Sequence, residues 1–121
     1  MIEELNRVRI GPFTTGEIPP LLEITFTDED GTAISLNGCT AKFVITCVTE
    51  EGMANLGEGN SDIPDPSSSG KTTYTWDTND MSRAGFYRGQ MWVGDGQDGR
   101  RYASDLYEWW VEDATPKPNG V

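Results

Sequence analysis

Apolar side chains recur at every second position in this chain, and this alternation is the feature that most constrains its fold. In residues 22–27 the apolar positions are Leu22, Ile24 and Phe26, with polar or charged residues between them. The same rhythm runs through residues 41–48, the longest β-prone stretch. Because successive side chains of a strand point to opposite faces, both stretches predict strands with one buried face. No stretch has a convincing helical period, so we predict an all-β fold.

Turn signals cut the chain into short segments. Asp30-Gly31 and Asn37-Gly38 are dipeptides that tolerate the positive φ of a tight reversal, and residues 95–99 have the composition of a hairpin turn. The 14 glycines and 7 prolines are also typical of many short strands joined by turns. Counting the segments gives roughly six to eight strands with turns about every 8–12 residues, which is the pattern of a β-sandwich.

The length of 121 residues is sufficient for one domain with a single core. Residues 50–70 hold little but Gly, Ser, Pro, Asp and Glu, and they predict one long loop of a functional or mobile kind. Two consecutive prolines at residues 19–20 cannot lie in a central strand. We therefore expect an N-terminal segment or edge strand at residues 1–20, a sandwich domain at 21–113 and a C-terminal tail at 114–121.

Acidic side chains outnumber basic ones by 20 to 9, giving a formal net charge of -11. Such a surface repels phosphate backbones, so we expect no nucleic-acid partner, and we expect partner surfaces to be neutral or basic. No stretch approaches the roughly 18 consecutive apolar residues of a membrane span, and the N-terminus lacks the apolar core of a signal peptide. We therefore expect no membrane partner.

The sequence contains no histidine, which removes the commonest general base and the commonest zinc ligand. A calcium loop needs oxygen ligands at its first, third and fifth positions, but a loop that starts at Asp77 has Met81 at the fifth. The alternation places no Asp or Glu on the inner side of a strand, so the buried acid of a glycosidase pair is not expected. We predict no enzymatic activity, no metal and no cofactor.

The two cysteines, Cys39 and Cys47, lie at opposite ends of the longest predicted strand. At ~3.3 Å per residue, an extended segment would hold them about 26 Å apart, whereas a disulfide needs α-carbons within ~7 Å. We predict two free thiols in a reducing compartment, with Cys47 packed as a small hydrophobic residue.

A longer motif spans both halves of the chain. Residues 70–76 read Gly-Lys-Thr-Thr-Tyr-Thr-Trp, followed by Asp80 and by Gly-Phe-Tyr-Arg at residues 85–88. Before them, the apolar strand at residues 22–26 runs into Asp-Glu-Asp-Gly at residues 28–31, a short apolar pair and the alternating strand. In order and spacing, this series resembles the N-terminal immunoglobulin-like module of phage baseplate upper proteins.

The resemblance covers residues 19–93 and implies an immunoglobulin-like β-sandwich of about seven strands with one long loop. It also implies a structural protein of the virion, in a tail, baseplate, neck or capsid-decorating position, assembled in the host cytoplasm. Its partners would be other virion proteins, with copies that are homo-oligomeric or arrayed by the symmetry of the particle. The chain departs from the family pattern in the inserted loop at residues 50–66 and in Trp109-Trp110.

The shared residues Asp80, Gly85 and Tyr87 lie where sandwich domains place a corner before a central strand. A tyrosine there buries its ring and donates its hydroxyl to nearby backbone, so we assign Tyr87 to stability. Trp76 is the expected large aromatic side chain of the core. The residues predicted for the core are Phe26, Phe43, Ile45, Trp76, Tyr87, Met91 and Trp109.

Trp109 and Trp110 are adjacent, so their rings face opposite sides of the last strand. Tyr107 and Val111 make the Trp109 side the more apolar one, and we expect Trp109 inside and Trp110 outside. An exposed Trp110 has three explanations that the sequence leaves open: a protein-docking anchor, a platform for a sugar ring, or a side chain covered by the N-terminal segment.

Docking on neighbouring virion subunits is the leading functional hypothesis. The candidate contact residues are Trp92, Trp110, Phe86 and Ile63. A carbohydrate-binding sandwich that uses its exposed tryptophans is the alternative. A hydrolase is a remote third hypothesis, because no nucleophile is paired with a base.

Overall fold

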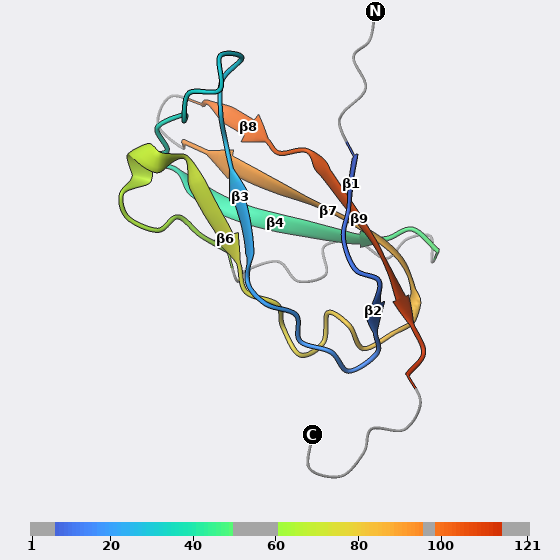
Figure 1. The fold of residues 1–121 in the computed structure, drawn as a ribbon. Coiled ribbons are helices and arrows are strands. Elements are labelled where there is room, and N and C mark those ends of the chain that lie inside the picture. The colour runs from blue at the N-terminus through green and yellow to red at the C-terminus, as the bar shows by residue number, and fades with distance from the viewer. Residues whose placement is uncertain (1–6, 50–60, 96–98, 115–121) are drawn as a thin grey trace, which may run out of the picture.

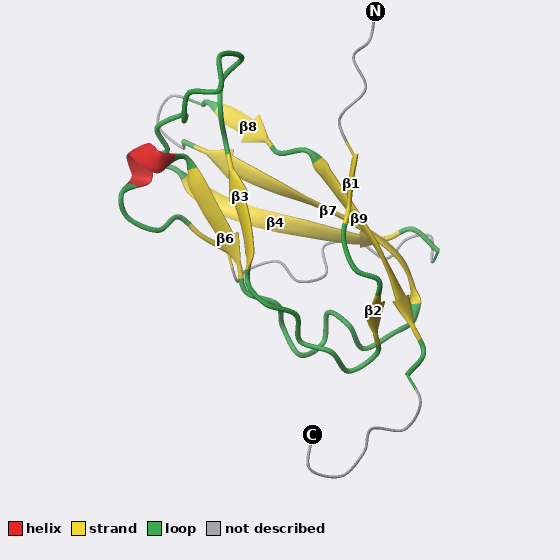
Figure 2. Ribbon diagram, viewed as in Figure 1, coloured by secondary structure: helices red, strands yellow, loops and turns green. Residues whose placement is uncertain are grey.

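Two β-sheets pack against each other in the computed structural model of this chain, which describes residues 7–49, 61–95 and 99–114 (Figure 1). The larger sheet has the order β1-β9-β7-β4, with β2 also paired to β9 and β8 to β7. The smaller sheet has the order β3-β6-β5. Strands and loops make up almost all of the described chain, which confirms the all-β prediction (Figure 2).

The strands of the larger sheet are β1 Arg7–Arg9, β2 Phe13–Thr14, β4 Thr40–Cys47, β7 Gly85–Gly94, β8 Arg101–Ala103 and β9 Leu106–Glu112. Those of the smaller sheet are β3 Leu22–Thr25, β5 Ser61–Asp62 and β6 Lys71–Tyr74. A 3-10 helix, η1 Ser67–Ser69, precedes β6.

The distribution of strands between the sheets is that of an immunoglobulin-like sandwich. β3, β5 and β6 form one sheet, whereas β4, β7 and β9 form the other, as in the BED and CFG sheets of that fold. The corner before β7 fits as well, because the Tyr87 hydroxyl donates a 2.7 Å hydrogen bond to the carbonyl of Arg83. The ring of Tyr87 is buried beneath this bond, so the hydroxyl ties the corner to the core.

The N-terminal segment contributes the edge of the larger sheet. β1 and β2 both pair with β9 in parallel, with Arg7 opposite Leu106 and Phe13 opposite Val111. The ends of the expected N-terminal segment and C-terminal tail, residues 1–6 and 115–121, lie outside the described residues.

The long loop expected at residues 50–70 is shorter than predicted. Residues 50–60 lie outside the described part of the chain, but β5 and η1 occupy much of the remainder. Tertiary partners order them: the Phe43 amide donates to Ser61 Oγ at 2.9 Å, and the Leu36 amide donates to the Ser67 carbonyl at 3.0 Å. Neither hydrogen bond can be predicted from the local sequence. The composition of residues 50–70 alone therefore predicts an uninterrupted loop.

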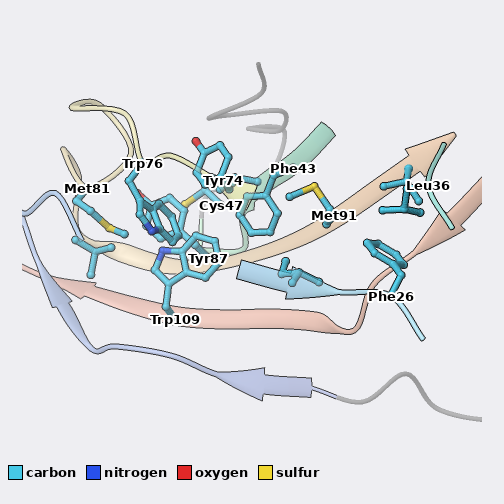
Figure 3. Packing of buried hydrophobic residues seen from close by; sticks show 14 residues of the cluster. Phe26, Leu36, Phe43, Cys47, Tyr74, Trp76, Met81, Tyr87, Met91 and Trp109 are labelled. Atoms are coloured by element: carbon cyan, nitrogen blue, oxygen red, sulfur yellow. The ribbon is translucent and has the colours of Figure 1, made fainter. Parts of the chain in front are cut away.

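Trp109 lies at the centre of the aromatic core between the sheets (Figure 3). Its ring stacks at centroid distances of 6.3 Å from Phe43 and 6.1 Å from Tyr87, and meets Trp76 edge-on at 5.3 Å. All the residues predicted for the core are buried: Phe26, Phe43, Ile45, Trp76, Tyr87, Met91 and Trp109.

Both cysteines are free thiols, as predicted. β4 extends without interruption from Thr40 to Cys47, so Cys39 and Cys47 lie at its two ends. Cys47 is buried in the core, and Cys39 is half-buried against it.

Candidate functional site

The alternation of β7 divides the larger sheet into an inner face, which packs on the smaller sheet, and an outer face. Tyr87, Met91 and Val93 are buried on the inner side, whereas Trp92 is exposed on the other side. The register of the sheet then assigns the neighbouring strand positions. We call the outer face the surface formed by Arg7, Arg9, Thr40, Lys42, Val44, Thr46, Phe86, Arg88, Gln90, Trp92, Arg101, Ala103, Leu106, Glu108, Trp110 and Glu112.

Three of the four predicted contact residues lie on the outer face. Trp110 is 45% exposed and Trp92 is 43% exposed. Phe86 is half-buried, and its ring lies 4.8 Å from that of Trp110, tilted by 36°. Ile63 does not join them, because it packs against the core beside β5. Ile63 therefore does not belong to the outer face.

Two guanidinium groups flank the ring of Phe86. The Cζ atoms of Arg9 and Arg88 lie 5.8 and 5.9 Å from the ring centroid, within the range of cation–π attraction. These residues come from β1 and β7, which are far apart in the sequence. The parallel pairing of β1 with β9 brings them to the same ring.

The Glu108 carboxylate interacts with two arginine side chains of the outer face. It accepts a 2.8 Å bond from Arg88 Nε and lies 3.8 Å from Arg7 Nη1. Only 5% of Glu108 is exposed, although the alternation places it on the outer side of β9 and not on the inner one. The reason is tertiary: Arg7 of β1 and Arg88 of β7, the strands on either side of β9, reach the carboxylate, and their cations compensate the buried charge.

A pocket of about 150 Å³ lies at the other end of the outer face, beside Trp92. It is lined by Lys42 from β4, by Arg101 from β8 and by the backbone of β7 near Gly94. A second pocket of about 250 Å³ adjoins it, sharing Thr40, Gly94 and Arg101. Trp92 thus lines a pocket together with two cations, and at the opposite end Trp110 packs on Phe86, whose ring has two cations close to it.

A second buried carboxylate, Asp80, has a structural role away from this face. It accepts a 2.6 Å hydrogen bond from the Tyr74 hydroxyl and a 2.8 Å bond from the Asp77 amide. Burial raises the pKa of Asp80, although the bond from Tyr74 lowers it. Burial also raises the pKa of Tyr74, and the neighbouring carboxylate adds to that increase. The pair holds the turn between β6 and β7 to the core.

Tyr74→Phe is expected to change the alkaline stability of the protein. The folded state holds the Tyr74 proton more tightly than the unfolded chain, so the free energy of unfolding falls as the pH rises above about 10. In urea unfolding between pH 9 and 11, the variant should lose stability less steeply than the wild type. At pH 7 it should be less stable by about 1–3 kcal/mol, because Asp80 loses its donor. An equally steep alkaline fall in both proteins would contradict this assignment.

No group of three or more potential metal-binding side chains is found among the described residues. Over the same part of the chain, no helix has the length and apolar character needed to cross a membrane. No protein-family model matches the chain, and no curated protein matches it. The outer face must therefore be interpreted from its own geometry.

Sequence reasoning identified the exposed aromatic residues but missed the basic ones beside them. Arg88 and Lys42 could have been found, because they alternate with core residues on predicted strands. Arg9 and Arg101 could not, since their positions depend on how β1 and β8 pair with the sheet.

Proposed function

We propose that this protein is a non-enzymatic docking module of a phage particle, which contacts neighbouring virion subunits through its outer face. The observation that carries the proposal is the exposure of Trp92 and Trp110 on the same face of the larger sheet. Tryptophan is enriched among the residues that dominate binding energies at protein interfaces. The virion setting rests on the motif resemblance in residues 19–93.

The hydrogen bonds of the buried ionisable groups support a non-catalytic role. Asp80 is engaged by Tyr74 and by backbone, and Glu108 is engaged by Arg88. Both carboxylates therefore stabilise the fold or hold a surface side chain. With no histidine in the sequence, the acids also lack the commonest proton-transfer partner.

The symmetry of the particle strengthens the attachment of such a module. A face with two exposed tryptophans forms a small contact, and a single small contact is weak. Copies arrayed by the particle engage together, so the combined attachment is much tighter than each contact alone.

A double substitution, Trp92→Ser with Trp110→Ser, tests this proposal. Phage particles produced with the variant should contain at least about tenfold less of the chain than wild-type particles, measured by quantitative mass spectrometry. The matched control is Ile18→Ser with Leu21→Ser, which removes two exposed apolar side chains from outside the outer face. This control should be incorporated normally, and circular dichroism should show all three proteins folded.

Two results would contradict the proposal. One is a wild-type chain that remains as free monomer in the infected lysate and is missing from particles. The other is normal incorporation of the double tryptophan variant.

The exposed rings also keep carbohydrate binding as a second candidate, because the pocket beside Trp92 offers the polar side chains of Thr40 and Lys42. Binding on a glycan array that disappears in Trp110→Ala would favour this alternative, and an array without signal would exclude it.

A further inference from the structure

The charge of the outer face is opposite to that of the whole chain. Its strand positions carry five of the nine basic residues of the sequence but only two carboxylates, which gives a local charge of +3 in a chain of net charge -11. The basic residues are Arg7, Arg9, Lys42, Arg88 and Arg101, and the acidic ones are Glu108 and Glu112. The expectation of a neutral or basic partner came from the total charge, whose sign is opposite to that of this face.

The basic residues gather at the two exposed tryptophans. Arg9 and Arg88 flank Phe86 next to Trp110, and Lys42 and Arg101 line the pocket next to Trp92. Phe86 and Trp92 are six residues apart on β7, so the two clusters are separated by about 20 Å along the strand. Half-buried side chains such as Val44, Gln90 and Leu106 form the surface between them.

We propose that the outer face binds an extended acidic segment of a partner protein, which lies along β7 and contacts both clusters. This inference rests on the proposed function and adds the chemistry of the partner. Each cluster offers an aromatic surface for an apolar side chain and cations for the carboxylates around it. Arginine on an aromatic ring is already oriented for carboxylates, so little conformational freedom is lost on binding. A second copy in face-to-face contact is disfavoured, because it would bring five cations against five cations.

Peptide binding to the full chain tests this inference. The probe is a twelve-residue peptide of glutamate and serine with one leucine near each end, and its control has glutamine at every glutamate. We expect the acidic probe to shift amide resonances of β7, β8 and β9 in NMR spectra. The glutamine peptide should bind at least about tenfold more weakly, and the affinity of the acidic probe should fall with added salt. A four-residue acidic peptide with one leucine, too short to reach both clusters, should also bind more weakly.

Charge-neutral variants locate the site. Arg9→Gln with Arg101→Gln should weaken binding of the acidic probe about tenfold. Lys71→Gln with Arg83→Gln removes the same charge away from the outer face and should change the affinity less than about twofold. Arg88 is left intact, because its loss would strand the buried Glu108 carboxylate.

The inference is overturned by undetectable binding of the acidic probe or by equal binding of the glutamine peptide. Tighter binding of a twelve-nucleotide oligothymidylate to the same face would indicate a nucleic-acid partner instead. Self-association in sedimentation that the double tryptophan variant abolishes would indicate a second copy. If these assays fail while the tryptophan variant is still excluded from particles, the proposed function stands and only the acidic partner is wrong.

Discussion

Trp109→Ala is expected to lower the free energy of unfolding by about 3–5 kcal/mol, as large aromatic truncations in cores do. The Trp109 side chain is fully buried and contacts rings from three strands or loops, so its removal leaves a cavity that its neighbours cannot fill without moving. Urea unfolding followed by circular dichroism measures the loss without relying on tryptophan fluorescence.

The adjacent residue supplies a matched control for this truncation. Trp110→Ala makes the same chemical change one position along β9, on the exposed side, and should cost at most about 1 kcal/mol. Equal losses from the two variants would contradict the assignment of Trp109 to the core.

If Trp109→Ala does not fold, Trp109→Phe retains most of the apolar contact and gives a smaller, measurable loss. The Trp109 Nε1 group has no hydrogen-bond partner among the described residues, so phenylalanine sacrifices no hydrogen bond there. If Trp109→Phe were as stable as the wild type, this result would also argue against tight packing around Trp109.

Gly89→Ala is expected to destabilise the protein by about 3 kcal/mol through overpacking. A Cβ atom at this position would overlap Phe43 Cζ and lie 2.9 Å from Trp109 Cη2. Both atoms belong to rings held by the aromatic core, so neither can move aside as the end of a flexible side chain could. Gly89 therefore makes room in the centre of β7 for the core aromatic residues.

Gly94→Ala is the control for this substitution, because it lies on the same strand. Its added Cβ would have its nearest contact at 3.6 Å, from the Arg100 carbonyl oxygen. We expect a change within about 0.5 kcal/mol. A stability of Gly89→Ala close to that of Gly94→Ala, measured by thermal or urea unfolding, would show that Phe43 and Trp109 have more freedom than their packing indicates.

The inner and outer sides of the central strands could be predicted from the sequence. The opposite exposures of Trp109 and Trp110 follow from their adjacent positions on a strand and from the apolar side chains at Tyr107 and Val111. The same alternation in residues 86–93 puts Phe86 and Trp92 together on the side opposite Tyr87 and Met91. Residues 61–70 could not be predicted in this way, because their structure depends on partners such as Phe43 and Leu36.

The alternation of apolar and polar residues determined the all-β class, the core aromatic residues and the exposed tryptophans, because side-chain direction in a strand is a local property with a period of two. Only the tertiary structure decided which strands pair and therefore which charges meet. The parallel pairing of β1 with β9 brought Arg9 to Phe86 and Arg7 to Glu108, and the pairing of β8 with β7 brought Arg101 to Trp92. Strand pairing joins residues far apart in the sequence, so neither local pattern nor net charge could reveal a cationic face on an acidic protein.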